Sequence, residues 1–356
     1  MISLYQYQLP FSAPLRTGAG DILSRKGVLI RYQDRDLDLL SEASPLPGFS
    51  KENIDTVKKD LITIKPKLDS FLTTSCSIEQ LNQFISGPAS IQFAISDLAR
   101  KVIQIRGDFP INHPFFQSEK RSVLVNDIVG YHDPETTKRL ILSALDSGFK
   151  TIKIKVPTPD PDLAEVLREV STQKVDVNFR LDANQNWDIQ KLEVFNRLFK
   201  SLPIEYIEEP LGLHDDEEIE RISALCDYPI ALDESISDMD HLTQLLKQHP
   251  NLFIIIKPML LGNIFKLSET LSKYRSSYKR VVITSSLESA VGLETISLLA
   301  AFLGDKSRAH GLNTGKLFRQ DLTTDDTIKC GVFDLANRSS SAITMDQMDQ
   351  SLLTLL

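Results

Sequence analysis

Residues 151–156 read Thr151-Ile152-Lys153-Ile154-Lys155-Val156, a short run in which lysine and isoleucine alternate. A period of two is typical of a β-strand, so Lys153 and Lys155 should point to one face and the isoleucines to the other. Runs of similar strand character recur to about residue 310, and longer amphipathic segments separate them. This alternation predicts repeated strand–helix units.

Eight parallel strands are predicted, at residues 123–126, 151–156, 177–182, 205–209, 230–233, 253–257, 281–285 and 307–310. Polar residues close them at a steady interval: Lys155 to Asp182 is 27 residues, Asp182 to Glu208 is 26, Glu208 to Asp233 is 25, and Asp233 to Lys257 is 24. Such an interval accommodates one strand, one helix and two loops. Parallel units of this kind close into a barrel with its active site at the C-terminal strand ends.

We therefore predict an α/β fold, a (β/α)7β TIM-like barrel over residues 121–312. Residues 1–120 read as an α+β capping domain, with a strand at 27–31, a turn cluster at 44–50 and two helical stretches. The tail, residues 313–356, should pack back on the cap. An open dinucleotide-binding sheet is disfavoured, because no Gly-x-Gly-x-x-Gly follows an early strand.

Composition narrows the class of protein further. The 356 residues are 42% hydrophobic and 25% charged, which disfavours disorder and coiled coil. A net charge of −8 argues against a nucleic-acid partner. The chain shows neither a membrane-spanning run nor a signal-peptide pattern, so we expect no membrane partner and a cytoplasmic location. Cys76, Cys226 and Cys330 form no CxxC, and we expect buried free thiols.

Lys153 and Lys155 are the first candidates for chemistry. If their shared face is the barrel interior, the two ammonium groups depress each other's pKa, and one can act as a base near neutral pH. A solvated strand face is the alternative that the spacing leaves open.

Acidic residues close the next three strands, in the pairs Asp182 with Asn184, Glu208 with Glu209, and Asp233 with Glu234. Adjacent acids on a strand face opposite ways, so only one of each adjacent pair can enter the barrel. Taken singly, each pair also suits a turn or a helix cap. Three carboxylates at one rim would repel without a cation, and oxygen ligands favour Mg²⁺ or Mn²⁺.

Lys257 ends the apolar run at residues 253–256, where a lysine either is buried for a purpose or reaches to solvent. Its strand lies across the predicted barrel from Lys155, which favours two lysines flanking one substrate. The loops at 284–289 and 310–315 are rich in small residues, whose backbone N–H groups can bind a carboxylate. Plain turn chemistry is their alternative, and we expect His310 to be structural.

As an ordered set, these features resemble the enolase superfamily, its muconate-lactonizing-enzyme subgroup and, within it, the o-succinylbenzoate synthases. The subgroup marks are Lys153-x-Lys155, Asp182-x-Asn184, Ile207-Glu208-Glu209-Pro210, Leu232-Asp233-Glu234-Ser235 and Lys257. The narrower assignment depends on Pro45-Leu46-Pro47-Gly48-Phe49-Ser50, Arg180, Ser285-Ser286-Leu287-Glu288-Ser289 and His310-Gly311-Leu312. One departure is Ser41 before Glu42, where related proteins usually have glycine.

The resemblance implies a Mg²⁺-dependent dehydration of 2-succinyl-6-hydroxy-2,4-cyclohexadiene-1-carboxylate to o-succinylbenzoate, through an enediolate, in menaquinone synthesis. Asp182, Glu208 and Asp233 would bind Mg²⁺, with Mn²⁺ as a substitute, and Asn184, Glu209 and Glu234 would support them. Lys155 would move the proton, Lys153 would keep the pKa of Lys155 low, and Lys257 would stabilise the intermediate. Arg180, Ser285, Ser286 and Gly311 would bind the small-molecule carboxylate substrate.

Three different functions remain open at this level. An N-succinylamino acid racemase or another epimerase of the subgroup would also use a lysine on each face of the substrate. A Schiff-base lyase would use Lys155 or Lys257 as a nucleophile. A binding module would keep the acids for stability alone. The sequence leaves the choice between monomer and homo-oligomer open.

Overall fold

A parallel sheet of seven strands forms the body of the protein. In this computed structural model the described residues are 1–356 except 18–19, 36, 75–80, 82–84, 107–121, 214, 276–277, 279, 325–327 and 336–342. The sheet order is β11-β10-β9-β8-β7-β6-β5. The strands are β5 (Asp127–Val129), β6 (Thr151–Lys155), β7 (Asn178–Asp182), β8 (Ile204–Glu208), β9 (Ile230–Leu232), β10 (Phe253–Ile256) and β11 (Val281–Ile283).

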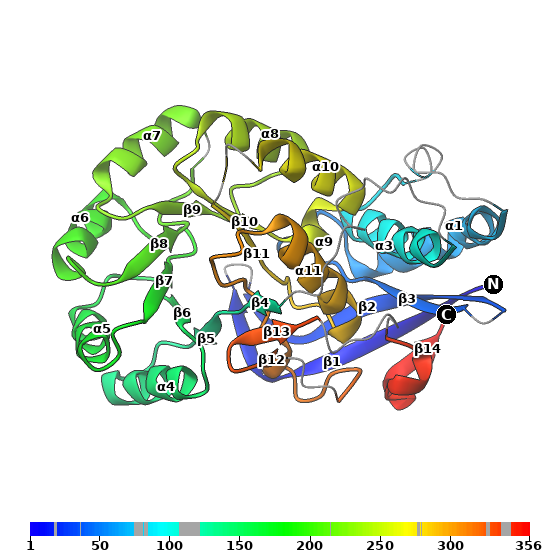
Figure 1. The fold of residues 1–356 in the computed structure, drawn as a ribbon, viewed down its shortest axis with the longest axis horizontal. Coiled ribbons are helices and arrows are strands. Elements are labelled where there is room, and N and C mark those ends of the chain that lie inside the picture. The colour runs from blue at the N-terminus through cyan, green and yellow to red at the C-terminus, as the bar shows by residue number, and fades with distance from the viewer. Residues whose placement is uncertain are drawn as a thin grey trace.

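Helices follow each of these strands and cover the outside of the curved sheet, as Figure 1 shows for α4 to α8. They are α4 (Pro134–Asp146), α5 (Pro161–Gln173), α6 (Ile189–Leu198), α7 (Asp216–Leu225), α8 (Met239–Gln248), α10 (Ile264–Tyr274) and α11 (Ala290–Leu303), and a short α9 (Pro258–Leu261) precedes α10. Aspartates at residues 133, 160, 188, 215 and 238 cap α4 to α8 by accepting backbone N–H bonds. These local signals explain why every unit turns back at nearly the same spacing.

Residues 310 and 311 join the two edges of the sheet. Val125 forms a parallel bridge with His310, and Thr284 forms one with Gly311. The (β/α)7β barrel is therefore confirmed, but its eighth strand is reduced to these bridges rather than the predicted strand at 307–310.

The predicted first strand at 123–126 is misplaced by a few residues, although its Val125 takes part in the closure of the barrel. Residues Ser122–Leu124 form β4, which pairs with β13 (Val332–Asp334) beside β12 (Ile328–Lys329) in a separate antiparallel sheet. The first barrel strand is β5, a few residues later, and it pairs with β6. Both segments are short and apolar, so only their partners distinguish them.

The capping part contains an antiparallel sheet of β1 (Ile2–Thr17), β2 (Gly20–Asp34) and β3 (Leu37–Ala43), in the order β14-β1-β2-β3. Its helices are α1 (Ile54–Thr74) and α3 (Ala89–Arg106), which lie against this sheet in Figure 1. The final strand β14 (Leu353–Leu355) pairs with β1, so the two termini lie together. Short 3-10 turns at Gly315–Leu317, Met345–Gln347 and Gln350–Leu352 precede it. The predicted domain boundaries stay predictions.

Buried polar contacts join the cap to the start of α11. The Glu42 carboxylate on β3 accepts hydrogen bonds from the Ser289 backbone N–H at 3.1 Å and the Gly292 N–H at 2.9 Å. The Arg25 guanidinium on β2 donates to the Leu287 carbonyl at 2.9 Å. These contacts fix how the cap sits over one side of the barrel.

Two smaller expectations have different outcomes. None of the helices in the described ranges combines the length and the apolar character that a membrane crossing requires. The expectation of buried thiols is wrong for Cys330, which is exposed at the β12–β13 turn with φ of 51°, while Cys226 is half-buried. Cys76 lies outside the described residues.

Candidate active site

Three carboxylates come together because neighbouring strands end in register. Lys155, Asp182 and Glu208 are successive Cα partners across β6, β7 and β8, and Asp233 directly follows β9. All three carboxylates are buried. Burial, together with Asp182 and Asp233, raises the pKa of Glu208 well above its usual value despite the nearby Lys153. A cluster of this kind requires positive charge.

Lys153 supplies part of that charge. Its Nζ lies 2.9 Å from Asp182 Oδ2 and 2.7 Å from Glu208 Oε1. Burial lowers the pKa of Lys153, but the two carboxylates outweigh it and raise this pKa well above the usual value. The side chain thus enters the barrel, as one of the two predicted orientations requires. Its pKa moves opposite to the expected mutual depression, because carboxylates rather than a second ammonium surround it.

Lys257 approaches from the other side of the barrel. Its Nζ lies 2.5 Å from Asp233 Oδ2 and 5.2 Å from the centre of the Phe49 ring on the capping part. Burial lowers the pKa of Lys257, while Asp233 and Glu234 raise it, with a net increase. Lys257 is therefore a half-buried, charged lysine that is held at the rim by Asp233.

The three predicted supporting residues connect the carboxylate strands. Asn184 donates from its backbone N–H to Asp182 Oδ1 at 3.0 Å and from its side chain to Glu234 Oε1 at 2.9 Å. Glu209 Oε1 accepts the backbone N–H groups of Asp233 at 2.7 Å and Ser235 at 2.8 Å. These bonds fix the loop that carries Asp233, although burial raises the pKa of Glu209 to about 7.

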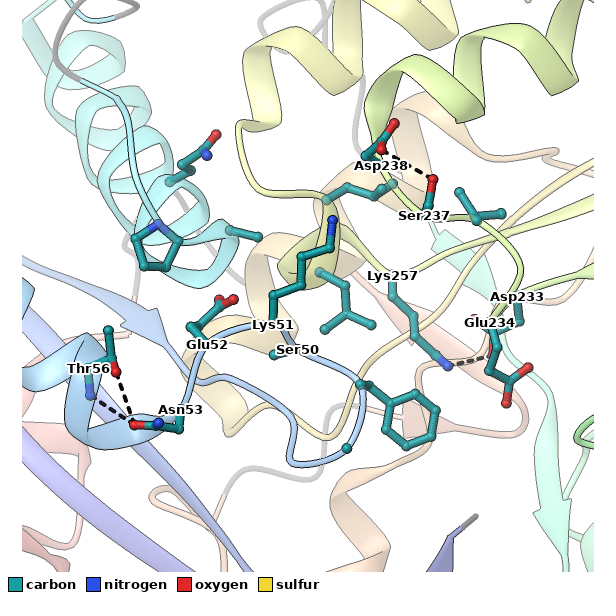
Figure 2. Close-up of a pocket in the computed structure, with 18 of the residues that line it drawn as sticks. Ser50, Lys51, Glu52, Asn53, Thr56, Asp233, Glu234, Ser237, Asp238 and Lys257 are labelled. Atoms are coloured by element: carbon teal, nitrogen blue, oxygen red, sulfur yellow. Dashed lines mark hydrogen bonds and ion pairs between the residues drawn. The ribbon is translucent and has the colours of Figure 1, made fainter. Parts of the chain in front are cut away.

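A cavity of about 950 Å³ lies between the cap and the rim of the barrel. Lys155, Asp233, Glu234 and Lys257 line its barrel side. Its cap side comes from the loop at residues 48–53 and from the first turns of α1 and α3. Figure 2 shows Lys257 extending toward Asp233 on one side of this space. The cavity can hold a small molecule against both lysines.

Arg180 lies within the barrel and is engaged by other residues. Its guanidinium forms an ion pair with Glu205 at 2.7 Å, donates to Asn126 Oδ1 at 3.1 Å and stacks 4.9 Å from the centre of the Tyr206 ring. The Nη2 atom is buried without a hydrogen-bond partner among the described residues. Arg180 is not one of the residues that line the described cavity.

In the last two loops, the backbone N–H groups of Ser285, Ser286 and Gly311 already have partners within the protein. The Ser286 N–H donates to Glu288 Oε2 at 2.8 Å, and the Ser285 hydroxyl donates to the same atom at 2.6 Å. The Ser285 N–H donates to the Gly311 carbonyl at 2.8 Å, and the Gly311 N–H donates to the Ile283 carbonyl at 3.0 Å. These bonds help to close the barrel. Ser285, Ser286 and Gly311 are not among the residues that line the described cavity.

His310 has a structural environment, as its sequence context predicts. Its Nδ1 accepts the Ile283 N–H at 2.9 Å, and its Nε2 lies 3.2 Å from the Asp305 carbonyl. These partners require the neutral tautomer with a proton on Nε2. Burial, with the charge of Arg180, lowers the pKa of His310 to about 4.

The acidic cluster suits a hard divalent cation. Asp182, Glu208 and Asp233 offer only carboxylate oxygens, which Mg²⁺ prefers. Glu208 Oε2 is buried and has no hydrogen-bond partner among the described residues. In the part of the chain that the structure describes, no group of three or more His, Cys, Asp or Glu side chains is arranged to hold a metal ion. Lys153 and Lys257 form ion pairs with the acidic cluster. The donor set and the unpaired oxygen therefore fit Mg²⁺, with the two ammonium groups as competitors.

Sequence reasoning missed the cap side of the cavity. Phe49, Lys51 and Gln92 line it, yet no sequence pattern gives any of them a site role on its own. The turn at 44–50 is visible in the sequence, but no local pattern places it over a barrel.

Comparisons with known proteins agree with this geometry. Residues 136–346 match the family model described as "Enolase C-terminal domain-like", so the chain belongs to this family, and the resemblance to the enolase superfamily is confirmed. Residues 1–97 match the model described as "MenC, N-terminal domain".

Three relatives are between 18% and 29% identical to this chain. The chain is 29% identical over 326 residues to an o-succinylbenzoate synthase of Aliivibrio fischeri, covering 90% of this chain and 92% of the relative. Two solved structures share the fold. Muconate lactonizing enzyme of Pseudomonas fluorescens has a TM-score of 0.79 at 18% identity, covering 98% of this chain and 95% of the other. For o-succinylbenzoate synthase of Thermosynechococcus elongatus, complexed with Mg in the active site, the TM-score is 0.68 at 23% identity, covering 90% and 94%.

Proposed function

We propose that the protein is a cytoplasmic, Mg²⁺-dependent dehydratase that converts 2-succinyl-6-hydroxy-2,4-cyclohexadiene-1-carboxylate to o-succinylbenzoate in menaquinone synthesis. The match of residues 1–97 to the MenC N-terminal model supports this narrower activity within the family. So does the likeness to relatives that carry the name o-succinylbenzoate synthase.

The observation that carries the proposal is the position of two lysines in one cavity. Lys155 ends β6 and Lys257 follows β10, and three strands separate these two in the sheet. Both side chains nevertheless line the space that contains Asp233. A substrate in this cavity would therefore meet an amine on each side, next to carboxylates.

The roles follow from these positions. Lys155 is the base that removes the proton beside the substrate carboxylate, and it then gives this proton to the departing hydroxyl, which leaves as water. Lys257 is held in its charged form by Asp233 and offsets the negative charge that develops on the substrate. The Phe49 ring lies against Lys257 from the cap and adds a favourable contact with its positive charge.

Asp182, Glu208 and Asp233 would hold Mg²⁺, or Mn²⁺ in its place. The bound ion supplies positive charge to the substrate carboxylate and to the charge that grows as the proton leaves. Asn184, Glu209 and Glu234 hold the three ligands in position through the hydrogen bonds described above.

Conversion of the cyclohexadiene carboxylate, followed by ultraviolet absorbance, tests the proposal. We expect turnover with Mg²⁺, loss of turnover in EDTA, and recovery when Mg²⁺ or Mn²⁺ is returned in excess. Turnover that survives EDTA would contradict the metal dependence. No turnover with the cation present, under conditions where Mg²⁺ still raises the melting temperature, would contradict the dehydratase itself.

A racemase is the second candidate, and the same pair of lysines favours it. A base on each side of the substrate is the arrangement that a two-base 1,1-proton transfer requires. Incorporation of deuterium from D2O into N-succinylamino acids, with change of configuration, would identify this activity.

A Schiff-base lyase and a binding module receive less support from the geometry. A Schiff base requires a neutral amine, and the pKa of Lys257 is raised by its carboxylate neighbours. Inactivation by borohydride in the presence of substrate would still reveal it. For a binding module, we would expect no turnover of any of these compounds and no effect of Mg²⁺ on melting temperature.

A further inference from the structure

The cap loop presents one lysine to the cavity from a fixed position. Lys51 lies next to Glu52 and Asn53, both of which are anchored to helices. Glu52 Oε1 accepts the Ser90 N–H at 2.9 Å and the Ser90 hydroxyl at 2.7 Å, at the start of α3. Asn53 Oδ1 accepts the Thr56 N–H at 3.0 Å, in the first turn of α1. The backbone at Lys51 is therefore held on its C-terminal side.

The Lys51 side chain lines the cavity apart from the two lysines of the barrel. Figure 2 shows it extending from the cap loop, with its ammonium group pointing in a different direction from that of Lys257. Its charge reaches the opposite rim: the His241 N–H chiefly, and Lys51 to a smaller degree, lower the pKa of Asp238.

Asp238 is already engaged as a helix cap. Its Oδ1 accepts the N–H groups of Asp240 at 3.0 Å and His241 at 2.9 Å, and its Oδ2 accepts the Ser237 hydroxyl at 3.2 Å. No ion pair within the described ranges joins Lys51 to a carboxylate. The ammonium group is exposed and can receive an anion from a bound molecule.

Three cationic side chains line the cavity: Lys155, Lys257 and Lys51. Lys257 pairs with Asp233, and Lys155 lies in register with Asp182, so both belong to the reacting end. We infer that Lys51 binds a second carboxylate of the substrate, at the end remote from the reacting carbon. This inference rests on the proposed function, whose substrate carries a succinyl carboxylate, and it makes Lys51 a specificity-determining residue that selects dicarboxylates.

The test compares ligands with and without that carboxylate. With the Mg²⁺-loaded enzyme, Lys51→Gln should raise KM for the cyclohexadiene dicarboxylate about fivefold to tenfold and change kcat by less than about twofold. It should weaken binding of o-succinylbenzoate by a similar factor in calorimetry. Binding of 2-butanoylbenzoate, which lacks the second carboxylate, should be the same in wild type and variant.

Two further variants serve as references. Lys51→Arg should retain most of the discrimination, because it keeps the positive charge. Lys59→Gln removes one exposed positive charge from α1 at a residue that does not line the cavity, and it should behave as wild type. Higher salt concentration should weaken binding of the dicarboxylate by wild type more than binding by Lys51→Gln.

The outcomes separate the role of Lys51 from the dehydratase activity. If wild type turns over its substrate but Lys51→Gln binds both ligands as wild type does, the role of Lys51 is wrong and the dehydratase stands. An equal loss for both ligands would also overturn it, since the effect would then not come from the second carboxylate. If wild type has no turnover but binds the dicarboxylate, the binding comparison still decides the role of Lys51, and if it binds neither ligand, both proposals fail.

Discussion

Lys155 ends β6 beside Asp182. Burial raises the pKa of Asp182, but the charge of Lys153 and, to a smaller degree, that of Lys155 outweigh it, and the net pKa is lowered. We predict that Lys155→Ala lowers kcat at least about a hundredfold, because a positioned general base contributes that much. The melting temperature should change little, since the side chain lies at the wall of an open cavity. Turnover is measured by absorbance and the fold by circular dichroism.

Lys150→Ala is the matched control for this experiment. Lys150 is exposed and precedes the first residue of the same strand, at the opposite end from the cavity. It should retain full activity. If Lys155→Ala retains turnover within about threefold of wild type, Lys155 is not the general base, because loss of a general base lowers the rate by a larger factor.

His310 gives the protein a pH-dependent stability. Its folded-state pKa of about 4 lies below the unfolded value of about 6.5, so between these values the unfolded chain binds more protons. Stability is therefore complete above pH 6.5 and falls as the pH drops toward 4. We predict that wild type loses about 2 kcal/mol more than His310→Asn between pH 7 and pH 5.

Urea unfolding at the two pH values measures this difference. Asparagine retains one acceptor and one donor for Ile283 and Asp305 but does not titrate. An equal loss in both proteins would show that His310 does not remain neutral in the fold.

At the residue scale, the spacing of polar residues in the sequence singled out candidate side chains, but it did not predict the groups with which they form hydrogen bonds and ion pairs. The alternation at residues 151–156 put Lys153 and Lys155 on one face but left open whether that face is the barrel interior, and the direction of the Lys153 pKa shift depends on carboxylates from two other strands. Ser285 and Ser286 were predicted to bind substrate, and the sequence pattern did not show that Glu288, two or three residues away, accepts hydrogen bonds from both of their hydroxyls. Short polar side chains readily form such local bonds, and composition alone does not reveal the competition.

At the scale of elements, the six middle strands begin and end within two residues of their predicted positions. Their sequences carry strong local signals, such as the run of isoleucines in β10 and the aspartate caps of the following helices. The first and eighth strands were misplaced, because β4, β5 and the bridges at 310–311 are too short to have a pattern of their own. Their pairing partners alone define them.

Gly311 is the point at which barrel closure can be tested. A Cβ added there would lie 2.8 Å from the Thr284 Cβ, which is too close, so the backbone at residue 284 or 311 must move. We predict that Gly311→Ala lowers the free energy of unfolding by about 1–3 kcal/mol. The control is Gly315→Ala, where an added Cβ would lie 3.7 Å from the nearest atom, on Asp321, and the change should stay within about 0.5 kcal/mol. If Gly311→Ala and Gly315→Ala change the free energy of unfolding by the same amount, the backbone does not pack tightly at this bridge.

At the scale of the whole molecule, the cavity exists because two separately patterned parts meet. The barrel supplies Lys155, Lys257 and the acids, while the cap supplies Phe49 and Lys51. The sequence predicts each part from its own periodicity. The contact between them depends on buried groups such as Glu42 and Arg25, whose partners are more than 200 residues away in the chain. Periodicity carries no information at that distance.

Glu42 is the residue through which this union can be tested. Its carboxylate accepts hydrogen bonds from the hydroxyls of Tyr7 and Ser44 in the cap. It also accepts hydrogen bonds from the backbone N–H groups of Ser289 and Gly292 at the start of α11. Glu42→Gln places an amide where donors converge, so buried N–H and O–H groups lose their acceptor. We predict a loss of about 2–4 kcal/mol in unfolding free energy. Asp38→Asn, which weakens a part-exposed ion pair within the cap, should cost less than about 1 kcal/mol.

Two probes show whether this contact stabilises the cap alone or both parts. The chain has one tryptophan, Trp187, buried in the barrel, so its fluorescence follows barrel unfolding, whereas circular dichroism follows the whole chain. Because Glu42 bonds directly to α11, we expect Glu42→Gln to lower both urea midpoints together. If the circular dichroism midpoint falls and the Trp187 midpoint stays in place, the cap unfolds by itself. The barrel would then be stable without the wall that completes its cavity, and the contact at α11 would orient the cap without stabilising the barrel.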